Sequence, residues 1–68
     1  MAETMFAALQ RKQIEATIGE LLLTDDYYMR QEIVERLRHL IAHADPTLDK
    51  TRLSEGALEE LHELHLLQ

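Results

Sequence analysis

The chain has 68 residues and forms one domain at most, with a core so small that its stability is expected to be marginal. It contains no cysteine, which excludes disulfides and thiolate-ligated metal sites as means of stabilising so small a fold. Seven basic against thirteen acidic residues give a net charge of −6, which argues against nucleic-acid binding because that binding depends on cationic groups.

Neither a basic face nor a membrane segment is visible in the sequence. The best basic cluster consists of Arg30, Arg36 and Arg38, and it is interleaved with Glu32 and Glu35. No apolar run approaches the ~20 residues that a membrane-spanning helix needs, and the first residues lack the basic region of a signal peptide. We therefore expect a cytoplasmic protein that binds neither nucleic acid nor membranes.

The composition predicts an all-α fold in a single domain, residues 1–68. Leu, Ala, Glu, Arg and Gln dominate, only two glycines and one proline interrupt them, and no segment alternates like a strand. Three helices are expected at about residues 3–23, 26–44 and 55–67, with a short helical turn at about 46–53. The first two should form a helical hairpin at the core of a helical-bundle homodimer.

The first predicted helix carries more apolar surface than one core-facing stripe needs. One face consists of Ala7, Ile14, Ile18 and Leu21, widened by Phe6 and Leu22, while Met5, Ala8, Ala16 and Leu23 lie toward a different side. Gly19 weakens the helix by about 1 kcal/mol relative to alanine, and we expect a close approach of another helix at that point.

The second predicted helix has the strongest apolar period in the chain. Its apolar positions, spaced 4, 3 and 4 residues apart, are Ile33, Leu37, Leu40 and Ala44, with Val34 and Ile41 beside them. Thr24 or Asp25 is expected to cap its start. Tyr27 should lie at the margin of the core, whereas Tyr28 is a candidate for partner contact, with core packing as the alternative.

Asp45-Pro46 is expected to end that helix, because proline disfavours helical geometry in the residue before it. The same pair can open the short helical turn, with Leu48 and Leu53 as its apolar contacts. Ser54 then caps the last helix, whose apolar stripe is Ala57, Leu61 and Leu64, with Leu58 and Leu67 at its margins.

Two histidines one helical turn apart, His39 and His43, are the best candidates for metal ligands. Measured from Leu37 at 100° per residue, they fall at about 200° and 240°, on the polar face and near Arg36. Two ligands beside a cation do not meet the three or four that zinc sites need, so we interpret them as exposed side chains and expect no cofactor. A metal- or pH-responsive sensor is the alternative, because four histidines, including a partly covered His65, would gain charge below about pH 6.5.

No enzyme signature is present, so we expect a protein without catalytic activity. Ser54, the only serine, is better used as a helix cap. The chain has no glycine-rich phosphate loop and no nucleophile paired with a base.

The segment ELLLTDDYYMRQEIVERLRHLIAHAD, residues 20–45, resembles the small enterobacterial regulators of biofilm formation and acid resistance, the AriR/YmgB–YcgZ family. The similarity lies in the order of an apolar helix end, a short polar break and a second helix with a leucine stripe. The glycine typical of that break is replaced here by Asp25 and Asp26. The resemblance implies an all-helical homodimer that connects signalling proteins without catalysis, and it assigns no functional residue.

These observations together predict a small bacterial or phage regulator or inhibitor that acts by binding another protein. A structural or dimerisation subunit of a larger assembly is the alternative. Its partners would be a second copy of itself and an unidentified protein. We predict that the interface consists of Ile14, Ile18, Leu21, Tyr28, Ile33, Leu37, Leu40 and Ile41.

Overall fold

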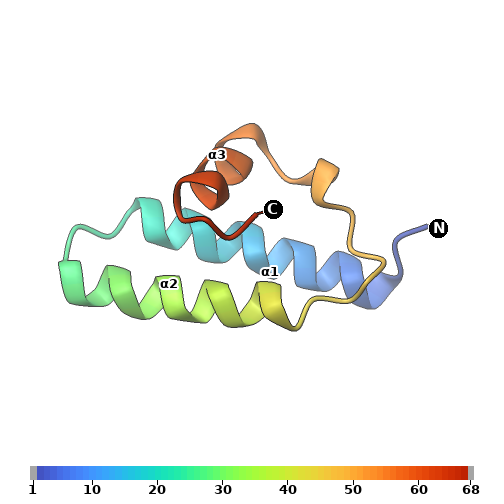
Figure 1. Ribbon diagram of the computed structural model, residues 1–68, viewed down its shortest axis with the longest axis horizontal. Coiled ribbons are helices and arrows are strands. Elements are labelled where there is room, and N and C mark those ends of the chain that lie inside the picture. The colour runs from blue at the N-terminus through green and yellow to red at the C-terminus, as the bar shows by residue number, and fades with distance from the viewer. Residues whose placement is uncertain (1, 68) are drawn as a thin grey trace.

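The computed structural model describes residues 2–67, which fold as three α-helices and one 3-10 helix (Figure 1). The α-helices are α1 (Met5–Leu22), α2 (Tyr27–Ala42) and α3 (Glu55–Glu63), and the 3-10 helix η1 (Lys50–Arg52) precedes α3. α1 and α2 run antiparallel as a hairpin, and α3 packs against α1 (Figure 1). The predictions of an all-α fold, three helices and a helical hairpin are confirmed.

α1 begins two residues later than expected because Thr4 caps it. The Thr4 hydroxyl oxygen accepts a hydrogen bond from the backbone N–H of Ala7 at 3.0 Å, which satisfies one of the free donors of the first turn. The Thr47 hydroxyl oxygen accepts from the backbone N–H of Thr4 at 3.2 Å, so the loop after α2 is attached to the start of α1.

The turn between α1 and α2 uses a different cap from the one expected. Asp26 caps α2 by accepting a hydrogen bond from the backbone N–H of Met29 at 3.0 Å. The prediction of Thr24 or Asp25 as the cap was wrong. Thr24 instead donates its hydroxyl to the carbonyl oxygen of Glu20 at 2.8 Å, so it closes the preceding helix rather than opening the next one.

The segment after α2 forms two separate turns instead of one helical turn over residues 46–53. The Asp45 carboxylate accepts hydrogen bonds from the backbone N–H and hydroxyl of Thr47, at 2.8 and 2.6 Å. Asp49 repeats this arrangement with Thr51 and caps η1. These contacts hold the pKa of both aspartates below the usual value, chiefly through the threonine hydroxyls. Each aspartate favours a local turn over a continuous helix.

α3 ends at Glu63, four residues before the predicted end, because His65 adopts a left-handed backbone with φ 58°. The backbone N–H of His65 donates to the carbonyl of His62 at 3.0 Å, and that of Leu66 donates to the carbonyl of Leu61 at 2.9 Å. This pair of bonds is the Schellman motif that terminates many helices. It turns the last residues back toward the core, where Leu66 and Leu67 pack.

The core lies where α1 meets α2, α3 and the segment before α3. Its main cluster is Ile14, Ile18, Leu37, Leu53, Ala57 and Leu61, and a smaller cluster near the hairpin turn is Leu21, Ile33 and Val34. The predicted inward faces of α1 and α2 are therefore confirmed. Phe6, Leu22 and Tyr27, which were expected to widen or border this core, are more than half exposed.

The close helix–helix approach predicted at Gly19 is not made within the single chain. A Cβ atom placed on Gly19 would meet no atom of the surrounding structure within 4 Å. The conformational cost of a glycine inside a helix is therefore not offset by tighter packing in the single chain.

Polar contacts join the start of α1 to the loop after α2. Both carboxylate oxygens of Glu3 accept from Arg11, and one also accepts from the backbone N–H of Asp49 at 2.9 Å. The Asp49 N–H and the Arg11 guanidinium hold the pKa of Glu3 below its usual value. The Gln10 amide accepts from the N–H of Asp45 at 2.8 Å, which fixes the end of the second helix against α1.

Candidate protein-binding surface

The histidine pair on α2 is exposed, on the face where the helical period places it. The ring centroids of His39 and His43 lie 4.3 Å apart, with the planes inclined at 49°. Within residues 2–67 no group of three or more His, Cys, Asp or Glu side chains is arranged to hold a metal ion. A metal bound at the pair would therefore lack a third ligand from the described part of the chain.

The C-terminal histidines are exposed as well. His62 lies on the open side of α3. His65 was expected to be partly covered, and this was wrong, because its left-handed backbone turns it out of the helical stripe. Within residues 2–67 neither ring forms a side-chain hydrogen bond or an ion pair, so neither belongs to a polar site.

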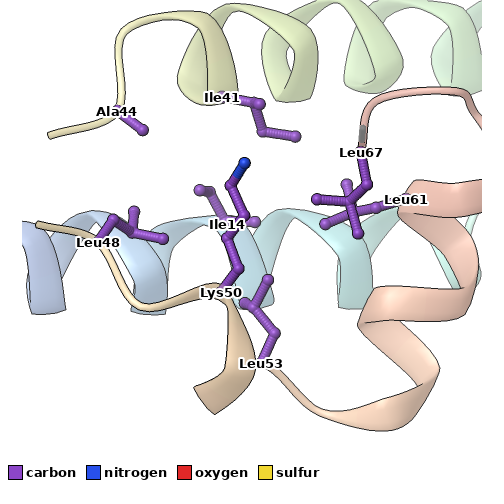
Figure 2. A pocket seen from close by; sticks show the side chains of 8 residues that line it. All are labelled: Ile14, Ile41, Ala44, Leu48, Lys50, Leu53, Leu61 and Leu67. Carbon is purple, nitrogen blue, oxygen red and sulfur yellow. The ribbon is translucent and has the colours of Figure 1, made fainter. Parts of the chain in front are cut away.

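A small apolar pocket among the described residues has too little space for a ligand. It lies between α1, the end of α2, η1 and the C-terminal segment, with a volume of about 10 Å³. Figure 2 shows leucine, isoleucine and alanine side chains around it and the Lys50 stem crossing it. Ligand sites usually measure about 300 Å³ or more and carry convergent polar groups. We interpret this space as a packing defect of the core.

The eight residues predicted to contact a partner do not form one surface. Five of them are buried in the core of the single chain: Ile14, Ile18, Leu21, Ile33 and Leu37. Leu40 and Ile41 are half-buried and pack against the main cluster. Tyr28 alone is freely exposed. In this fold a partner can therefore reach Tyr28 and parts of Leu40 and Ile41, but not the other five.

A different set of large apolar side chains is exposed, and it gathers at the two ends of α1. At one end lie Met5, Phe6 and Leu9. At the other end, where the hairpin turns, lie Leu22, Leu23, Tyr27, Tyr28 and Met29, which we call the hairpin tip. Every one of these eight side chains is at least 56% exposed. Figure 1 shows the hairpin turn and the N-terminal end at opposite ends of the molecule.

The hairpin tip is held in a defined shape by polar contacts behind it. The Arg30 guanidinium donates to the carbonyl of Leu21 at 2.9 Å and to that of Thr24 at 3.1 Å, so it closes the end of α1. The rings of Tyr27 and Tyr28 meet edge to face, with centroids 5.5 Å apart. A turn that displays aromatic and methionine side chains has the composition of the centre of a protein interface.

Comparison with protein-family models, with curated proteins and with solved structures finds no match. No helix among the described residues is long and apolar enough to cross a membrane. The surface chemistry of the chain is therefore the basis for assigning a function.

Sequence reasoning recognised that α1 has surplus apolar surface and placed Met5 and Leu23 on its second side, but did not name them as partner contacts. The residues that it missed are Leu9 and the exposed Met29 on α2. Their signal was available in part, because residues 5, 9, 16 and 23 repeat at helical spacing on the side of α1 opposite its strongest stripe.

Proposed function

We propose that this chain is a small non-enzymatic regulator or inhibitor that binds another protein through its hairpin tip, and that it does so as a homodimer. The observation that carries the proposal is the exposure of five large apolar side chains within residues 22–29. Soluble monomers rarely expose such side chains together, and contiguous apolar patches usually mark interaction sites.

The composition of the tip supports a protein partner over a small ligand. Tyrosine and methionine are enriched at interface centres, and tyrosine contributes a large contact area at low cost in side-chain entropy. The exposed Asp25 and Asp26 border the tip. The chain also carries a net charge of −6. A partner surface with an apolar groove and a basic rim would complement both features.

The resemblance of residues 20–45 to the AriR/YmgB–YcgZ regulators supports the same class of function, because it implies a helical connector without catalysis. It stays a proposal here. No polar cavity or metal-ligand cluster among residues 2–67 favours a sensor.

Affinity capture followed by mass spectrometry, with variants matched for exposure, tests the proposal. The double variant Tyr28→Ser and Met29→Ser removes tip side chains that lie outside the core. The control is Glu59→Ser with His62→Ser, two exposed positions of α3. We expect a host protein that the parent chain and the control retain and that the tip variant loses, with helical circular dichroism unchanged. Equal retention by all three chains would contradict the proposal.

A further inference from the structure

A second stripe with coiled-coil spacing runs along the side of α1 away from the core. Its members follow one another at intervals of 4, 3, 4, 3 and 4 residues, and they are Met5, Leu9, Lys12, Ala16, Gly19 and Leu23. At 100° per residue these positions share one face, opposite the buried Ile14 and Ile18. Two helices pack in a coiled coil along a seam of this spacing. We call these six residues the outer stripe.

The outer stripe is open within the single chain. Met5, Leu9 and Leu23 are among the most exposed large apolar side chains, at 82%, 60% and 87%. Lys12 and Ala16 are exposed too, and open space surrounds the Cβ position of Gly19. α2 and α3 both pack on other sides of α1. The stripe is therefore available to a second molecule.

The surface area of the chain is larger than that of a compact monomer. A protein of 7.9 kDa is expected to expose about 4,400 Å², whereas this chain exposes 5034 Å². The excess of about 600 Å² approaches the roughly 800 Å² that each partner buries in a standard interface. The outer stripe is about 27 Å long from its first to its last residue, so it offers a second helix a seam of about five turns.

We propose that the outer stripe packs against the outer stripe of a second copy, with the two α1 helices antiparallel. This inference rests on the homodimer of the proposed function and specifies its interface. When the stripe is paired with itself end for end, Met5 lies opposite Leu23 of the second copy. Leu23, which also belongs to the hairpin tip, is then covered in the dimer, and Leu22, Tyr27, Tyr28 and Met29 remain for the partner protein. Leu9 then lies opposite Gly19 of the second copy, and Lys12 opposite Ala16.

The register matches large side chains with small ones. Leu9 fills the space left by the glycine, and the aliphatic stem of Lys12 covers Ala16, so the helices approach closely at the centre. The Gly19 that has no packing role in the single chain gains one in the dimer. Knobs of one helix entering holes of the other are the contacts by which such seams associate.

Charge selects the antiparallel orientation over the parallel one. A parallel pair in register would place the two Lys12 ammonium groups against each other and would leave a gap between two glycines at position 19. In the antiparallel pair each Lys12 instead lies opposite Ala16 of the second copy, near its exposed Glu20, which also pairs with Arg36. Glu15 bonds Ser54 and lies outside the seam. Opposite charges beside an apolar seam favour the orientation that brings them together.

Glutamine substitution at the two glycines tests the packing. Both Gly19 and Gly56 have open space at Cβ, so Gly19→Gln and Gly56→Gln both fit the single chain, and glutamine forms helices better than glycine. We expect sedimentation equilibrium of the parent and of Gly56→Gln to give twice the 7.9 kDa chain mass at micromolar concentration. Gly19→Gln should weaken dimerisation about tenfold or more, because its side chain occupies the space of Leu9. Equal dimerisation of the two variants, or a monomeric parent, would overturn the proposal.

Cysteine cross-linking tests the orientation, because the chain has no cysteine of its own. Met5→Cys and Leu23→Cys chains are mixed, allowed to exchange and oxidised. The antiparallel register predicts that most disulfides join position 5 of one chain to position 23 of the other, as peptide mass mapping would reveal. Disulfides that join only like positions would identify a parallel pair and overturn the register.

The two proposals fail independently. If the chain is monomeric but the tip variant still loses a captured protein, the interface proposed here is wrong and the binding function stands. If the chain dimerises through α1 but tip substitutions leave capture unchanged, the interface stands and the binding function is wrong.

Discussion

Arg11 Nε donates to both carboxylate oxygens of Glu3, at 3.2 and 3.1 Å, and the Glu3 side chain is only 4% exposed. The same carboxylate accepts from the backbone N–H of Asp49, which lies 46 residues further along the chain. Glu3 therefore joins the start of α1 to the loop after α2 through one carboxylate. Its loss would leave buried donors without an acceptor.

We expect Glu3→Gln to lower the melting temperature at pH 7 more than Glu59→Gln does. Glutamine cannot accept from the guanidinium and the Asp49 N–H as a carboxylate does, because its amide offers one oxygen and no charge. Glu59 is exposed and serves as the matched control. Thermal melts followed by circular dichroism measure the difference, and equal melting of the two variants would show that the Glu3 contacts are dispensable.

Acid should destabilise the parent chain by protonating the Glu3 carboxylate. The pKa of Glu3 is lowered by folding, so its contribution is fully present above its usual value of 4.5 and is lost as the pH falls through the lowered folded value. Asp45 and Asp49 act in the same direction, below their usual value of 3.8. We expect melting temperatures to fall below about pH 4.5 and to fall less in Glu3→Gln. An identical acid response of the two chains would contradict this assignment.

Leu37→Ala should unfold the chain, whereas His39→Ala should leave it intact. Leu37 is fully buried at the centre of α2, and removing its side chain costs about 2–5 kcal/mol. A small domain has little more than about 5 kcal/mol in total. His39 is exposed on the same helix, and its removal should change the free energy of unfolding by no more than about 0.5 kcal/mol. Urea titration followed by circular dichroism compares them, and a larger loss in His39→Ala would mean that the faces of the helix are reversed.

His65→Gly is expected to stabilise the protein by about 1 kcal/mol, because a left-handed backbone is costly for any residue with a Cβ. His65 has φ 58° at the end of α3. The control His62→Gly places glycine inside the last turn of that helix, where it should destabilise by about 0.5–1 kcal/mol. Thermal melts of the two variants and the parent chain measure both changes in stability. A destabilised His65→Gly chain would mean that the imidazole itself makes a needed contact.

Zinc should bind the histidine pair of α2 weakly. The ring centroids of His39 and His43 lie 4.3 Å apart on an exposed face, and two imidazoles alone do not complete a zinc site. Calorimetric titration of the parent chain and of the double variant His39→Ala with His43→Ala should give similar small heats. Tight stoichiometric binding that the double variant loses would instead support the sensor alternative.

The sequence by itself determined the local features of this protein. The leucine and isoleucine period predicted which faces of α1 and α2 turn inward, because a helix repeats every 3.6 residues wherever it packs. Ser54 was predicted to cap α3, and its hydroxyl accepts from the N–H of Ala57 at 3.2 Å. Such features depend on residues within one or two turns of each other, which the linear order brings together.

The tertiary structure decided everything that joins distant segments. The turn at Asp45 is local, but its attachment to α1 depends on Gln10, 35 residues earlier, whose side-chain oxygen accepts from the Asp45 N–H. α3 ended early because the chain after His65 turns back, which allows Leu66 and Leu67 to pack on the core. The exposed apolar side chains also depend on this arrangement, since a third helix of nine residues covers only one side of α1. The helical period of the sequence showed that α1 has more apolar surface than one core face needs. Only the packing of α2 and α3 determined which apolar side chains stay exposed.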